Sequence, residues 1–146
     1  MKTLNLTIQP RAPRLWQVAG LTHSHGMAVF GQIREGLDGK VARLITDWAK
    51  ITQRDLSEMS GISLMAFSRR AKTQFSAEQS EQLVRIIRVI DRTVELFEGD
   101  KEKALKWLNL PSKVLRGKAP KELLVSETGA YEVMKLIIRL EHGVYS

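Results

Sequence analysis

Residues 77–97 constrain the fold of this 146-residue chain more than any other stretch. The preceding Ser76-Ala77-Glu78-Gln79 is a capping box, in which the serine and glutamine satisfy free amides at the start of a helix. The sequence therefore predicts one long helix, from about Ala77 to Phe97. Its apolar face is too wide for one neighbouring helix to cover, so we expect this connecting segment, residues 76–99, to join both halves of the chain in one core. The apolar residues are Leu83, Val84, Ile86, Ile87, Val89, Ile90, Val94 and Phe97.

Composition excludes several classes of protein. The chain is 43% hydrophobic and 27% charged, which is typical of a globular domain and excludes a disordered chain. No apolar run approaches the roughly 18 residues of a membrane span, and Lys2 is not followed by the apolar core of a signal peptide. The absence of cysteine fits a cytoplasmic protein. We therefore expect a cytoplasmic protein with no membrane partner.

The net charge of +7 is unevenly distributed. Residues 1–75 hold 11 Lys and Arg against 5 Asp and Glu, whereas residues 76–146 hold 12 against 11. A basic first half beside a nearly neutral second half favours an anionic partner for the first half only. A basic surface that serves solubility alone is the alternative.

The N-terminal segment, residues 1–26, contains no clear element. Leu4, Leu6 and Ile8 alternate with polar residues as in a short strand, but prolines interrupt the residues that follow. Residues 22–26 are typical of a loop. We leave the structure of this segment open.

From residue 27 onward the apolar spacing is helical, so the sequence predicts an all-α protein. Two helices are predicted before residue 50, the first ended by glycines at 36 and 39. Their inward residues are predicted to be Met27, Phe30, Ile33 and Leu37 in the first, and Val41, Leu44, Ile45 and Trp48 in the second.

Residues 52–72 follow a more specific order. Thr52 can cap a helix that stops before Gly61, and Ser63 can cap a second helix over residues 64–71. Glycine permits the turn that sets the second helix across the first, and Ile62 holds that turn to the core. Helix, glycine turn, apolar residue, cap and helix is the order of a helix-turn-helix, so residues 27–75 are predicted to form a DNA-binding domain.

This order resembles the Cro/repressor-type, Xre-like DNA-binding domain, with Gln53, Leu56, Ser57, Gly61, Ile62 and Phe67 at the marker positions. Ser57 stands where the family usually has alanine, and Arg70 where a third apolar anchor is common. We expect Ala71 to supply that anchor. The resemblance implies that the outer residues of the second helix face DNA, with Arg69 reading a guanine edge and Gln53, Arg54 and Lys72 holding phosphates. The predicted DNA-binding residues are Gln53, Arg54, Ser63, Met65, Ser68, Arg69 and Lys72. Because few of these residues are cations, we expect a monomer to bind DNA weakly. A homodimer is therefore expected to be needed for binding to operator DNA.

Residues 100–146 contain short helices with their own start signals. Asp100 and Ser126 can cap helices, while Pro111 and Pro120 can each begin a single turn. The last helix has so few polar residues that we expect burial on most sides, with part of its surface against a second chain. His142-Gly143 is a typical helix stop. No helix-stop signal explains the residues that follow, Val144-Tyr145-Ser146.

These residues resemble the toxin-binding domain of Xre/MbcA/ParS-type antitoxins. The resemblance implies an antitoxin that binds a co-encoded toxin, usually a RES-domain enzyme that degrades NAD, and represses its own operon in a type II toxin-antitoxin system. It also implies that the C-terminal tail covers the toxin active site. The matching features are Ala104, Trp107-Leu108, Pro111, Leu115, Gly117, Pro120, Leu123-Leu124, Gly129, Val133 and the closing residues Glu141, His142, Gly143, Val144, Tyr145 and Ser146.

The closing residues, Glu141 to Ser146, are thus the predicted toxin-binding site. Their histidine, tyrosine hydroxyl and terminal carboxylate could meet groups that otherwise hold a dinucleotide. We expect no enzymatic activity and no cofactor, because no glycine-rich phosphate loop is present. No metal site is expected either, because His23 and His25 have no evident further ligands. The alternative function is a stand-alone dimeric transcriptional repressor whose C-terminal half only dimerises, and an adjacent toxin gene would distinguish the two.

Overall fold

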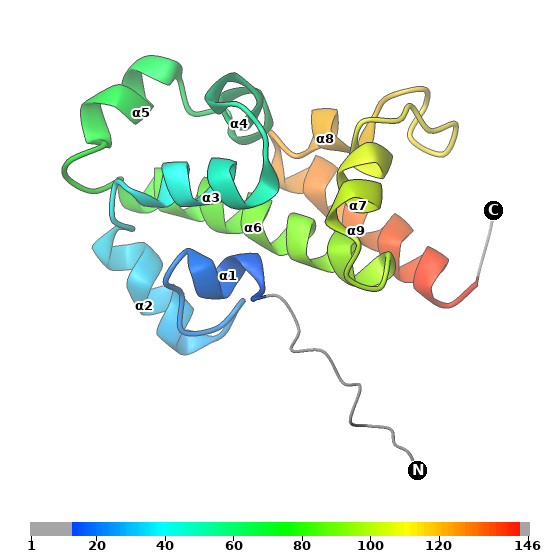
Figure 1. Ribbon diagram of the computed structural model, residues 1–146, viewed down its shortest axis with the longest axis horizontal. Coiled ribbons are helices and arrows are strands. Elements are labelled where there is room, and N and C mark those ends of the chain that lie inside the picture. The colour runs from blue at the N-terminus through cyan, green and yellow to red at the C-terminus, as the bar shows by residue number, and fades with distance from the viewer. Residues whose placement is uncertain (1–12, 144–146) are drawn as a thin grey trace, which may run out of the picture.

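The computed structural model describes residues 13–143, and its regular elements are all helical (Figure 1). This confirms the predicted fold class. Isolated β-bridges join Asp38 to Gln74 and Ser112 to Lys118. No helix in the described range is long and apolar enough to cross a membrane. The helices are α1 (Leu15–Val18), α2 (Met27–Glu35), α3 (Val41–Ala49), α4 (Gln53–Ser60), α5 (Leu64–Arg70), α6 (Ala77–Leu96), α7 (Lys101–Leu108), α8 (Pro120–Leu123) and α9 (Glu127–Glu141).

The long helix α6 is the centre of the molecule. Ser76 and Gln79 form the predicted capping box, with the Ser76 hydroxyl accepting a hydrogen bond from the Gln79 amide. In Figure 1 this helix runs through both halves of the molecule, and it contacts α1, α2, α4, α7 and α9. All its predicted apolar residues are buried except Phe97, which lies partly buried at the C-cap. The prediction of a shared core is confirmed.

The first predicted helix, α2, is present, and Ile33 and Leu37 of its predicted apolar series are buried, whereas Met27 and Phe30 are not. Met27 is 80% exposed and Phe30 is 54% exposed, whereas Val29 and Ile33 are buried. Val29 and Ile33 are four residues apart and so share a face, which α2 turns towards α6. The sequence of α2 allows two sets of apolar residues at helical spacing, one with Met27 and Phe30 and one with Val29. Packing against α6 decides which set is buried.

Part of the N-terminal segment packs into the core. Leu15, Ala19 and Leu21 are buried on and beside α1. The buried carboxylate of Asp91, on α6, accepts hydrogen bonds from the backbone amides of Leu15 at 2.7 Å and Trp16 at 3.0 Å. Burial raises the pKa of this carboxyl, and the two amide hydrogen bonds oppose that rise. The residues of the possible strand, Leu4 to Ile8, lie outside the described range.

The C-terminal half packs α7, α8 and α9 against the far end of α6 (Figure 1). Asp100 and Ser126 cap α7 and α9 as predicted, and Pro120 begins α8. Between α7 and α8 the chain forms a turn rather than a helix, closed by the bridge of Ser112 to Lys118. Within one chain α9 is less buried than expected, because Tyr131 is 62% exposed and Ile138 is 42% exposed.

Candidate functional site

The pair α4 and α5 is built by local hydrogen bonds. Thr52 and Asp55 form a capping box at the start of α4, with each backbone amide donating to the other side chain at 3.0 Å. The hydrogen bond from the Thr52 amide holds the pKa of Asp55 below its ordinary value. Gly61 ends α4 at φ 82°, a left-handed conformation that favours glycine. The Ser63 hydroxyl then accepts the Ala66 amide at 3.0 Å and begins α5.

Aromatic packing holds α5 to the core. Ile62 and Phe67 are buried, as predicted, and Phe67 meets Phe75 edge to face at 5.9 Å between ring centroids. Phe75 supplies the anchor that had been expected from Ala71, which is exposed. That expectation was wrong because the chain turns after α5, and Phe75 returns from the turn onto Phe67. An aromatic residue just before the capping box of α6 is the sequence feature that could have predicted this anchor.

The residue Ser57 has a structural role that alanine could not fill. Its hydroxyl donates a hydrogen bond to the Ile62 carbonyl oxygen at 2.6 Å. This bond ties the last turn of α4 to the residue that leads into α5. The departure from the family's usual alanine therefore reinforces the turn between the two helices.

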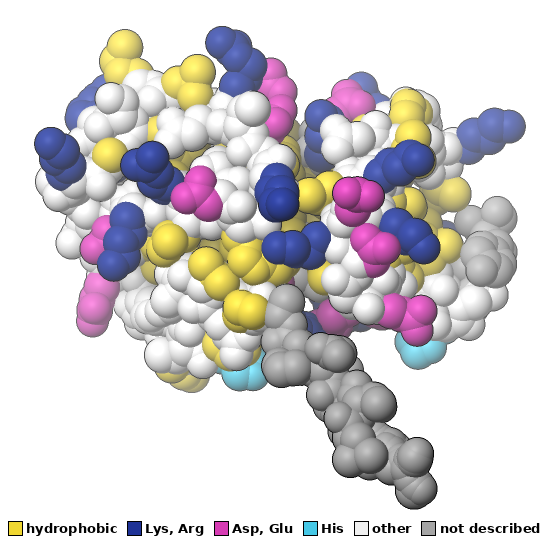
Figure 2. All heavy atoms as spheres, viewed as in Figure 1, with side chains coloured by type: hydrophobic (Ala, Val, Ile, Leu, Met, Phe, Trp, Pro, Cys, Tyr) yellow, Lys and Arg dark blue, Asp and Glu magenta, His cyan; other side chains and the backbone are white. Residues whose placement is uncertain are grey.

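The predicted DNA-binding residues Gln53, Arg54, Ser63, Met65, Ser68, Arg69 and Lys72 are all exposed. The three cations among them form no ion pair with any residue that the structure describes. Met65 is 70% exposed, and its neighbour Leu64, which was not predicted, is 40% exposed. In Figure 2, Lys and Arg side chains lie over the end of the molecule that carries α4 and α5. The outer face of α5 thus combines apolar and cationic groups.

The second candidate site begins at the C-terminal end of α9. His142 is the C-cap, and its amide donates to the Ile138 carbonyl oxygen at 3.2 Å. Gly143 has φ 70°, so the predicted helix stop is present. Glu141, His142 and Gly143 are exposed, and Val144, Tyr145 and Ser146 lie outside the described residues.

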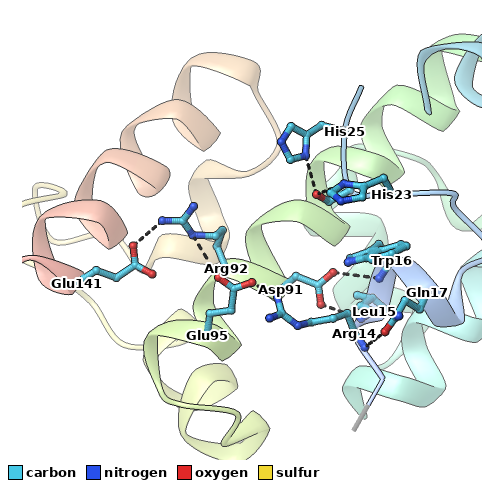
Figure 3. Close-up of polar contacts among 11 residues, drawn as sticks. Arg14, Leu15, Trp16, Gln17, His23, His25, Asp91, Arg92, Glu95 and Glu141 are labelled. Carbon is cyan, nitrogen blue, oxygen red and sulfur yellow. Dashed lines mark hydrogen bonds and ion pairs between the residues drawn. The ribbon is translucent and has the colours of Figure 1, made fainter. Parts of the chain in front are cut away.

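Charged residues from three parts of the chain meet near this end (Figure 3). Arg14 pairs with Glu95 on α6, and Arg92, one turn before Glu95, donates to Glu141 of α9 at 2.5 Å. These residues, except Glu141, border a cavity of about 310 Å³ that Trp16, His25, Arg88 and Met134 also line. Sequence reasoning did not find this arrangement, because nothing local pairs residues so far apart in the chain.

Two family models match the chain. Residues 29–88 match the antitoxin Xre-like helix-turn-helix domain, and residues 92–143 match the antitoxin Xre/MbcA/ParS C-terminal toxin-binding domain. The chain is 37% identical to Antitoxin Xre of Photorhabdus laumondii over 134 residues, which are 90% of each chain. It is 38% identical to Antitoxin Xre of Yersinia enterocolitica over the full length of both. The chain belongs to the Xre antitoxin family.

This Xre-family antitoxin therefore has an N-terminal helix-turn-helix domain and a C-terminal toxin-binding domain, and it is not an enzyme. The two family models meet inside α6, between residues 88 and 92. One continuous helix thus carries the core of both domains. Arg92 and Glu95, which reach the end of α9 and the N-terminal segment, lie at the start of the toxin-binding part.

Proposed function

We propose that this Xre-family antitoxin neutralises a co-encoded RES-type, NAD-degrading toxin with the residues that close its chain. The observation that carries the proposal is the end of α9. The helix stops at His142 and Gly143, and both residues are exposed at the surface of the molecule. We propose that His142, Tyr145 and the Ser146 carboxylate enter the toxin's active-site cleft and block it. Glu141, Gly143 and Val144 form the remainder of this contact.

Co-expression tests this proposal. The protein lacking residues 143–146 is expressed together with the product of the adjacent toxin gene, and growth is compared with that of cells holding the full chain. We expect protection to be lost. Circular dichroism of the shortened protein serves as the control for folding. Full protection by a folded, shortened protein contradicts the blocking role.

We further propose that α5 binds operator DNA upstream of the protein's own gene and represses transcription. Arg69 and Lys72 support this role, because both are exposed and neither forms an ion pair with a residue in the range 13–143. We propose that Arg69 reads a base edge and that Lys72 holds a phosphate. Arg54 and Gln53, at the start of α4, would hold further phosphates. Ser63, Met65 and Ser68 complete the proposed interface.

A gel shift on the upstream region tests the DNA interface. Arg69→Ala is expected to cost about 1–3 kcal/mol and to relax sequence preference, and Lys72→Ala is expected to weaken binding to all sequences alike. Lys106→Ala on α7 is the matched control, since it removes an exposed cation from the other half of the molecule. Unchanged affinity of both α5 variants at moderate salt contradicts the assignment.

The same proposal includes a homodimer. Two copies would present two α5 helices to successive half-sites, as helix-turn-helix proteins commonly do. The exposed apolar residues Tyr131 and Ile138 on α9, and Met27 and Phe30 on α2, are the surfaces available for such an association. Sedimentation at several concentrations measures the state directly. A monomer at the concentrations that retard DNA contradicts it.

A further inference from the structure

We propose that Arg92 positions the end of α9, and with it the toxin-binding tail, through its ion pair with Glu141. The inference rests on the proposed role of the closing residues in binding the toxin. The two groups approach from different elements, with Arg92 on α6 and Glu141 in the last turn of α9 (Figure 3). Neither residue is placed among the DNA-binding or core residues described above.

The position of Glu141 is electrostatically unfavourable unless something compensates it. The C-terminal end of a helix carries partial negative charge, so a carboxylate in the last turn is destabilising there. Arg92 supplies the compensation, because its guanidinium donates to the Glu141 carboxylate at 2.5 Å. The pair therefore offsets the unfavourable interaction between the Glu141 carboxylate and the negative end of the helix. This carboxylate lies one residue before His142 and two before Gly143.

A second carboxylate, that of Glu95, lies near the Nε side of the Arg92 guanidinium. Glu95 lies 3.9 Å from the Arg92 Nε, and Glu95 also pairs with Arg14 from the N-terminal segment. The Arg92 Nε is buried and has no hydrogen-bond partner among the described residues. The Arg92 guanidinium thus lies between Glu95 and Glu141, and its one hydrogen bond to these two carboxylates goes to Glu141.

The arrangement connects three segments that are distant in sequence. Asp91, the neighbour of Arg92, binds the first amides of α1, and α1 brings Arg14 to Glu95. The side chains of Arg14, Arg92 and Glu95 are each about one third exposed, so any single pair is weak. Their effect is on geometry, because the Arg92–Glu141 pair ties the last turn of α9 to the central helix α6.

Amide hydrogen exchange of the free protein tests the inference without any toxin. Arg92→Gln is expected to speed exchange in the last turn of α9, residues 139–143, by about three- to tenfold, with core amides of α6 unchanged. In a Glu141→Gln background, Arg92→Gln is expected to change this exchange by less than about twofold, because the carboxylate that pairs with Arg92 is already removed. Lys135→Gln is the matched control, because it breaks the Glu132–Lys135 pair on α9 itself and leaves the contact with α6 intact.

Affinity for the toxin gives the second readout. Arg92→Gln is expected to weaken binding about three- to tenfold, while Lys135→Gln leaves it within twofold. Unchanged exchange at residues 139–143 in Arg92→Gln overturns the inference, whatever the affinity. So does an equal effect of Arg92→Gln in the Glu141→Gln background. If the unaltered protein does not bind the toxin at all, the proposed function fails, and the exchange measurements still decide whether Arg92 orders the end of α9.

Discussion

The two ends of this molecule are specified in different ways. The pair α4 and α5 is held by contacts between residues close in sequence, such as the Thr52–Asp55 capping box and the bond from Ser57 to Ile62. The end of α9 is held by Arg92, which is 49 residues away from Glu141. The turn within the proposed DNA-binding surface is therefore set by residues of its own segment, although α5 also needs the packing of Phe67 on Phe75. The toxin-binding end depends on the rest of the fold.

The same contrast appears in what each end exposes. The outer face of α5 presents cations that are free of ion pairs within the described residues, as a surface for phosphates would. At the end of α9, Arg92 is already paired with Glu141, which is the first of the residues proposed to meet the toxin.

The largest predicted effect comes from the aromatic anchor of α5. Phe67→Ala is expected to destabilise the protein by about 3–5 kcal/mol, because Phe67 is 2% exposed and packs against Phe75. Urea unfolding followed by circular dichroism measures the change. Phe30→Ala, at a position 54% exposed, is the control and is expected to cost little. A similar loss in both variants would mean that Phe67 does not anchor α5 in the folded protein.

The next effect concerns the carboxylate that holds α1. Asp91→Ala is expected to cost about 1–2 kcal/mol at neutral pH, because the buried amide of Leu15 and the half-buried amide of Trp16 lose their acceptor. The loss should appear in urea unfolding and as faster amide exchange over residues 15–21. Asp47→Ala, on the exposed side of α3, is the control. Retained protection at residues 15–21 would show that apolar packing alone holds this segment.

Two N-caps compare the ends directly. Ser63→Ala and Ser126→Ala each remove a hydroxyl that accepts a backbone amide, from Ala66 and Gly129 respectively, and each is expected to cost about 1 kcal/mol. If the ends are specified separately, Ser63→Ala weakens DNA binding and leaves toxin binding intact, and Ser126→Ala does the opposite. Gel shift and calorimetry measure the two affinities. Equal losses of both activities in either variant would show that the ends are coupled.

The smallest effect is a pH dependence of opposite sign at two carboxyls. The folded protein lowers the pKa of Asp55 from 3.8, chiefly through the Thr52 amide, so its contribution to stability is present above about pH 3.8 and lost as the pH falls through the lowered pKa. Burial raises the pKa of Asp91 from 3.8, so its contribution is full below that pH and declines as the pH rises through the raised pKa.

Unfolding free energies between pH 3 and 6 measure both trends. The deficit of Asp55→Asn relative to the unaltered protein should shrink towards low pH, and that of Asp91→Ala should shrink towards high pH. Asp47→Asn is the control for general charge effects, since Asp47 is exposed. Parallel trends in the two variants contradict the assigned causes.

Much of the fold was predictable because its signals are local. The caps Thr52, Ser63 and Ser76, and the stops at Gly61 and Gly143, each depend on residues within a few positions, and all are present as predicted. Two of the predicted inward residues of α2, Met27 and Phe30, and the anchor of α5 were predicted wrongly. Both depend on what packs against the helix, since Val29 faces α6 and Phe75 returns onto Phe67 after a turn.

The candidate sites divide in the same way. The DNA-binding residues were predicted from their positions in a recurring motif and lie exposed on α4, α5 and the turn that follows, though their role in binding stays a prediction. The Asp91 and Arg92 contacts were missed, because a charged residue on a long helix gives no sequence signal of a partner many residues away. The Val144-Tyr145-Ser146 part of the predicted tail lies outside the described residues.

By itself the sequence determined the helices from residue 27 onward, most of their ends and the helix-turn-helix order, because capping, glycine turns and apolar spacing act over a few residues. The family came from a resemblance in its motifs. Only the tertiary structure decided how the N-terminal segment docks, which residues of α2 are buried and which side chain pairs with the last turn of α9. Those choices depend on desolvation and charge pairing between distant segments. Asp91 and Arg92, adjacent on α6, make the two contacts that no local pattern specifies.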